Sequence, residues 1–170
     1  MAEAGGDRDD DRDEALAGEE LARMRTLAWE LYEARPEHPR IAELAQSVLA
    51  RAPEMTGMII LTALHREACG ETEEARRVLR ELVGRRDRQY LNAVKNLRDI
   101  EYSRGDYAEA LRLTEIVLRE DPEADWTERM EQGTALVFVS SPEEGWRRID
   151  EAVELCARTD PDWYADALGQ

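Results

Sequence analysis

Two histidines and two cysteines are the side chains of this 170-residue chain best suited to general-base, nucleophilic or metal-binding chemistry. His38 adjoins a proline-rich turn and His65 lies near the end of an expected helix, and each is interpreted as standing alone. Cys69 and Cys156 are far apart in sequence and are read as lying outside any metal-ligand motif. We predict that both are small buried apolar residues, with a disulfide or a reactive thiol as the alternative.

Other catalytic patterns are missing from the sequence as well. It contains no nucleophile elbow, no phosphate-binding loop and no carboxylate pair that is distinct from the general acidity. The pairs Glu73-Glu74 and Glu143-Glu144 belong to first turns of expected helices, where acidic side chains are favourable beside the positive helix end. We therefore expect a protein that is not an enzyme and that needs no cofactor or metal.

The charge balance favours a basic protein as the partner. The chain has 39 acidic and 23 basic residues and a net charge of −16, which argues against direct binding of nucleic acid or of anionic membranes. Solubility alone is the plainer explanation of the acidity. The first 20 residues hold nine acidic residues against two arginines. We predict that residues 1–17 form an acidic tail that is disordered, or helical only toward its end. Its expected role is that of a plain solvated tail, with a regulatory arm as the alternative.

Composition predicts an all-α protein. Charged residues make up 36% of the chain and aromatic residues 6%, and the only runs typical of strands, Met58–Ile60 and Val137–Val139, fall inside helical periodicity. No stretch reaches the roughly 18 apolar residues of a membrane helix, and the N-terminus has no signal pattern, so we expect a cytoplasmic protein. The excess of arginine over lysine indicates a high-GC bacterial gene.

The helices that must position any site are clearest between Leu91 and Trp126. Two amphipathic helices are expected there, joined by a Gly-Asp turn. Gly105 can adopt the left-handed conformation that ends a helix. Asp106 can cap the next helix, and Glu109 completes a pair similar to a capping box.

This stretch resembles the tetratricopeptide repeat (TPR). The resemblance rests on the Gly105-Asp106-Tyr107 turn, on Ala110 three residues after that tyrosine, and on the closing Asp121-Pro122. The pattern also recurs along the chain. The residues equivalent to Ala110 are Ala75, 35 positions upstream, and Gly145, 35 positions downstream. A further step of 34 upstream from Ala75 reaches Ile41.

The resemblance implies a right-handed α-solenoid of about four TPR-like helix-turn-helix repeats plus a C-terminal capping helix. The expected units are residues 18–53, 55–87, 89–122 and 124–158, followed by a capping helix over 161–168 that contains Trp163, Tyr164 and Leu168. In the fourth unit Ser141 is the expected cap, and Gly133 is expected opposite Gly145, so that two backbones can touch.

In TPR proteins the first helix of each unit lines a concave groove, and fixed positions of that helix face it. Carried over to this chain, these positions predict a partner-binding groove lined by Arg23, Thr26, Glu30, Ile60, Leu64, Glu67, Asn92, Lys95, Asp99, Tyr102, Thr127, Met130 and Thr134. Ile60 and Leu64 are equally well explained as core residues. Arg98 falls where a small residue is usual, and a shift of one residue would replace Lys95 by Val94 in the groove.

The leading hypothesis is a non-catalytic protein-protein interaction module, an adaptor or dedicated chaperone, that binds a peptide or helix of a partner in this groove. One alternative is a self-associating scaffold, in which Trp126, Trp146 or the Trp163-Tyr164 pair packs between copies. A second is an acidic inhibitor of a basic, nucleic-acid-binding enzyme.

Overall fold

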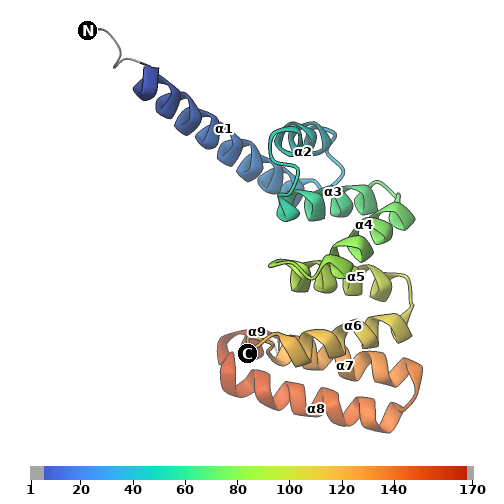
Figure 1. The fold of residues 1–170 in the computed structure, drawn as a ribbon. Helices are drawn as coiled ribbons and strands as arrows, with labels where there is room; N and C mark the ends of the chain where they lie inside the picture. Colours follow the sequence, from blue (N-terminus) through green and yellow to red (C-terminus); the bar gives the residue numbers. More distant parts are fainter. Residues whose placement is uncertain (1–5, 168–170) are drawn as a thin grey trace. The chain divides into compact units, whose positions relative to one another are not determined.

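The computed structural model describes the backbone of residues 6–167 and the side chains of residues 18–167. Within that range the chain forms helices and no strand (Figure 1). The helices, in chain order, are α1 (Gly6–Ala34), α2 (Arg40–Arg51), α3 (Thr56–Ala68), α4 (Thr72–Arg85), α5 (Tyr90–Ser103), α6 (Tyr107–Glu120), α7 (Trp126–Val139), α8 (Pro142–Thr159) and α9 (Pro161–Ala167). The all-α prediction is confirmed over the described residues.

Local sequence explains where several of these helices begin and end. Gly70 and Gly105 have φ angles of 86° and 78°, a left-handed conformation that costs glycine little and ends α3 and α5. The Asp106 and Ser141 side chains each accept a hydrogen bond from the backbone N–H three residues on, which caps α6 and α8. The predicted turn and both predicted caps are thus confirmed.

The end of α4 and the start of α1 are less sharply marked in the sequence. No proline follows α4, and this helix continues to Arg85 before Arg86 adopts a φ of 48°. The first helix was expected from about Gly18, but α1 begins at Gly6, so residues 6–17 are helical rather than a disordered tail. Extending an existing helix is far easier than nucleating one, and acidic residues are favourable near its positive N-terminal end. Residues 1–5 lie outside the described part of the chain.

The chain divides into two compact units, Met1–Val78 and Leu79–Gln170. In the first unit, apolar faces of α1, α2 and α3 enclose one core. This core comprises Ala28, Ile41, Leu44, Ala45, Val48, Met58 and Leu61. These residues recur at the helical spacing of three and four that places side chains on one face.

The second unit contains the end of α4 and helices α5 to α9. Its core comprises Leu79, Leu82, Ala93, Val94, Leu97, Ile100, Ala110, Leu113, Val117, Ala135, Ala152 and Cys156. At its C-terminal end, the Trp163 ring of α9 packs on the Trp126 ring of α7, with 4.5 Å between ring centroids. Leu168, which was also expected in the last helix, lies outside the described residues.

Helices α7 and α8 run side by side (Figure 1). Two glycines, Gly133 and Gly145, stand where their backbones touch. A Cβ atom added to Gly145 would lie 2.7 Å from the Gly133 carbonyl oxygen and 2.6 Å from the Val137 backbone nitrogen. Real Cβ atoms essentially never make such contacts, so only glycine fits here. The predicted contact between these two backbones is confirmed.

The three small residues that defined the period occupy the same place in their helices. Ala75, Ala110 and Gly145 are each the fourth residue of a helix, in α4, α6 and α8 respectively, and each is buried. Ile41, near the start of α2, is also buried.

Candidate functional site

A pocket of about 260 Å³ opens in the second unit between the faces of α5 and α7. Five side chains line it: Asp99 and Tyr102 from α5, and Met130, Glu131 and Thr134 from α7. Spacings of three and four residues place these side chains on one face of each helix. Four of the five are predicted groove residues, which the structure brings together here.

A buried arginine contacts both carboxylates that line this pocket. Arg98 is only 5% exposed. Its guanidinium group contacts the Asp99 carboxylate at 3.0 Å and the Glu131 carboxylate at 2.5 Å. One Glu131 oxygen is buried without a well-oriented hydrogen bond despite that short distance. The three residues therefore form a charged cluster with one carboxylate in excess.

Removal from water raises the pKa of Glu131 to about 7. Arg98 opposes this shift, while Asp99 and Glu128 add to it through like charge. The short contact with Arg98 favours the carboxylate, but the lost hydration outweighs it. A second cation at this position would stabilise the charged form of the Glu131 carboxylate in place of the lost water.

Tyr102 is the one aromatic side chain among the five that line the pocket. The Tyr102 hydroxyl donates a hydrogen bond to the backbone carbonyl of Glu131, which joins α5 to α7. Burial, reinforced by the Arg98-bound Glu131 carboxylate, raises the pKa of Tyr102, so the hydroxyl remains a donor at neutral pH. The Tyr102 ring packs edge-on against Tyr107, which in turn stacks on Phe138.

Lys95, predicted to line the groove, instead joins α5 to the start of α7. Its Nζ lies 2.8 Å from the Asp121 carboxylate and 3.2 Å from that of Glu128. The hydrogen bond to Asp121 is the main reason that the pKa of Lys95 is raised. The lysine is thus held in structural ion pairs. Val94, the alternative groove residue, is fully buried.

Glu128 is fixed by the same contacts and by the cap of α7. Burial acts to raise its pKa, but hydrogen bonds from the Asp125 backbone, Lys95 and Thr127 outweigh burial and lower the pKa to about 2. Asp125 accepts from the Thr127 backbone at 2.7 Å, and the two acidic residues form a reciprocal capping box. Thr127 therefore belongs to this cap, and Asn92, at the other end of the predicted row, is exposed on α5.

The remaining predicted groove residues lie in the first unit and have mixed environments. Arg23, Thr26 and Glu30 are exposed on α1, and Leu64 and Glu67 are half-buried on α3. Ile60 is 3% exposed and is therefore core, because α3 is apolar on more than one side. Its prediction as a groove residue is wrong.

Two residues of the pocket cluster were missed by the sequence interpretation. Glu131 lies one position after the predicted Met130, and Arg98 one position before the predicted Asp99. Arg98 itself could have indicated the cluster, because it stands at a position usually taken by a small residue. A long cationic side chain buried at such a position needs a carboxylate on the facing helix, which here is α7.

The pocket has the chemistry of a binding site for a cation. It offers two carboxylates, two hydroxyl groups and a polarisable thioether. Among the described side chains, no group of three or more histidine, cysteine or acidic residues is arranged to hold a metal ion. Over the same residues, no helix combines the length and apolar character needed to cross a membrane.

Comparison of the chain with models of known protein families, with curated proteins and with solved structures finds no match. Inference about its function therefore rests on the residues and their geometry.

Proposed function

We propose that the chain is a non-catalytic protein-protein interaction module, an adaptor or dedicated chaperone. In this proposal it binds a segment of a partner protein and takes a lysine or arginine side chain of that segment into the α5–α7 pocket. The observation that carries the proposal is the pocket itself, because its walls combine excess carboxylate with aromatic and thioether surface. A long cationic side chain is amphipathic in the same way.

The local charges favour a basic partner over an acidic one. Around the pocket, the cations Lys95 and Arg98 stand against four carboxylates: Asp99, Asp121, Glu128 and Glu131. The stem of an incoming side chain would pack on Met130 and Tyr102, and its head would lie between Asp99 and Glu131. The net charge of −16 would speed the approach of such a partner at low salt.

The TPR-like arrangement is part of the same proposal. It is supported by the small buried fourth residue of α4, α6 and α8, and by the left-handed glycines after α3 and α5. In a right-handed solenoid of such helix pairs, α5 and α7 would be the first helices of two successive repeats and would face the same groove. Four residues at positions that face the groove in TPR proteins, Asp99, Tyr102, Met130 and Thr134, line the α5–α7 pocket.

Affinity capture of partners from the source cell tests the proposal. Asp99→Arg reverses a charge at the pocket, and Asp150→Arg makes the same change at an exposed position of α8 outside it. We expect the partner to be retained by wild-type protein and by Asp150→Arg, and to be lost with Asp99→Arg. A partner bound equally by all three proteins would show that the pocket is not the binding site.

Self-association is a second candidate function, favoured by an exposed apolar surface on α7 and α8. Phe138, Val139 and Trp146 are 62%, 41% and 58% exposed, and large apolar side chains left exposed can mark an interface between proteins. If this surface joins copies of the chain, sedimentation should show a concentration-dependent dimer that Trp146→Glu abolishes. A monomer over the whole concentration range would exclude this function.

A further inference from the structure

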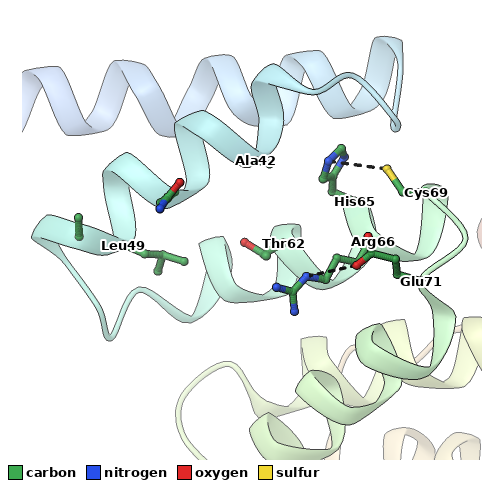
Figure 2. Close-up of a pocket in the computed structure, with 9 residues that line it drawn as sticks. Ala42, Leu49, Thr62, His65, Arg66, Cys69 and Glu71 are labelled. Carbon is green, nitrogen blue, oxygen red and sulfur yellow. Dashed lines mark hydrogen bonds and ion pairs between the residues drawn. The ribbon is translucent and has the colours of Figure 1, made fainter.

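A second pocket, of about 680 Å³, lies in the first unit between α2 and α3 (Figure 2). His65 and Cys69, near the C-terminal end of α3, line one side of it, and Thr62 and Arg66 lie on the same helix (Figure 2). The pocket is separate from the α5–α7 pocket and plays no part in the proposed function. It contains both a nucleophile and a base.

The two side chains are hydrogen-bonded to each other. His65 Nε2 lies 3.8 Å from Cys69 Sγ, within the range of a hydrogen bond to sulfur. They meet because residues four apart share a helix face, and the Cys69 backbone N–H still bonds to the His65 carbonyl at 3.0 Å. Gly70 then ends the helix with its left-handed φ, which leaves the thiol exposed.

The direction of this hydrogen bond follows from a third group. His65 Nδ1 lies 2.7 Å from the Pro36 carbonyl oxygen in the turn between α1 and α2. A carbonyl oxygen can only accept, so the proton of the neutral imidazole is on Nδ1. Nε2 therefore presents its lone pair to the Cys69 S–H. His65 is only 8% exposed, so the surrounding protein holds the ring in this orientation.

This arrangement has the parts of an activated nucleophile: a thiol, a base hydrogen-bonded to it, and a group that orients the base. We propose that Cys69 is a modification site that reacts with low-molecular-weight disulfides, with His65 as its base. The pocket provides room beside the sulfur for the half of the disulfide that becomes attached.

The reaction is a thiol–disulfide exchange with no net oxidation or reduction. His65 Nε2 accepts the Cys69 proton, and the sulfur attacks one sulfur of the disulfide. A bond forms between these two sulfurs while the original S–S bond breaks. The leaving thiolate then takes the proton from His65, whose Nδ1–H remains bonded to Pro36. One mixed disulfide on Cys69 and one free thiol result.

Cys156 serves as an internal reference. It is 2% exposed, and burial, aided by nearby carboxylates, raises the pKa of its thiol. The burial and the raised pKa both slow the reaction of Cys156, since only an accessible thiolate attacks a disulfide quickly. In the native protein we therefore expect one fast thiol and one that reacts only after unfolding.

The test is the rate of reaction with dithiodipyridine, a neutral disulfide that releases a coloured product, at neutral pH. In the Cys156→Ser background, native Cys69 should react about tenfold faster than the same thiol in the urea-unfolded chain. Changing His65→Gln should remove this advantage. The matched change His38→Gln, at the other histidine, should leave it intact. Oxidised glutathione should then add one glutathionyl group, located at Cys69 by mass spectrometry.

Two results would overturn the proposal. One is a native Cys69 rate equal to or below the unfolded rate, a comparison that does not depend on whether the His65 variant folds. The other is a folded His65→Gln protein, with unchanged circular dichroism, that keeps the wild-type rate. Because the pocket and its variants lie in the first unit, neither result bears on partner binding at α5–α7.

Discussion

Replacing Gly145 by alanine is expected to destabilise the second unit by about 2 kcal/mol. The added Cβ would meet the Gly133 carbonyl at 2.7 Å and the Val137 backbone nitrogen at 2.6 Å. Both obstacles are backbone atoms, so α7 and α8 must move apart and lose packing along their contact. Urea denaturation followed by tryptophan fluorescence measures the loss, since Trp126, Trp146 and Trp163 all lie in this unit.

Gly84→Ala is the matched control for this substitution. Gly84 is exposed within α4, and a Cβ added there meets no atom within 4 Å. Alanine is the better helix former, so this change should stabilise by a few tenths to about 1 kcal/mol. If Gly145→Ala proved as harmless as Gly84→Ala, the close contact of α7 and α8 would not exist in solution.

Replacing Arg98 by methionine is expected to cost about 2 kcal/mol at pH 8 and clearly less at pH 5. The substitution keeps the apolar stem but removes the cation that contacts Glu131 and Asp99. The pKa of Glu131 in the folded protein is raised to about 7, so folding favours the protonated form of this side chain. The stability that protonated Glu131 contributes is fully present below about pH 4.5 and is lost as the pH rises through the folded pKa. Without Arg98, the folded protein at pH 8 must hold an uncompensated carboxylate.

Urea titrations of the Arg98→Met variant and wild type at the two pH values measure this difference. Arg112→Met is the control, because Arg112 pairs with Glu109 at the exposed surface of α6. Exposed pairs contribute little, so this variant should change stability by at most about 0.5 kcal/mol at either pH. An equal loss for Arg98→Met at pH 5 and pH 8 would contradict the coupling between Arg98 and Glu131.

The helices and their junctions could be predicted from the sequence because their signals are local. Gly105 and Asp106 specify the turn between α5 and α6 by backbone freedom and capping, whatever the rest of the chain does. The contact of Gly133 with Gly145 was predictable because the TPR-like repeat scheme places these two positions opposite each other. The start of α1 was not, since composition alone does not show how far an existing helix extends into an acidic segment.

The candidate site was predictable only where helical periodicity decides it. Periodicity assigns Asp99, Tyr102, Met130 and Thr134 to one face of their helices, and these four meet at one pocket. It does not say where the flexible end of a long side chain goes. Lys95 therefore lies on a predicted face, yet its Nζ reaches Asp121 and Glu128.

Burial of individual residues also depended on neighbours that the sequence does not identify. Ile60 became core because α3 is covered on the side assigned to the groove. Cys156 is buried as predicted, but the prediction for Cys69 was wrong, because Gly70 ends α3 directly after it and exposes its side chain. The spacing of four between His65 and Cys69 was visible in the sequence, whereas the Pro36 carbonyl that orients His65 was not.

Methyl NMR of methionine tests the central proposal most directly. The chain has five methionines, and Met130 alone lies in the second unit, in the wall of the α5–α7 pocket. The other four are Met1, Met24, Met55 and Met58. The capped tripeptide Ala-Arg-Ala is the probe, and its neutral isostere with citrulline in place of arginine is the control. We expect the arginine peptide to shift the Met130 methyl resonance in a saturable way and the citrulline peptide to leave it unchanged. A Met130 resonance that neither peptide moves, or that both move equally, would contradict cation binding in this pocket.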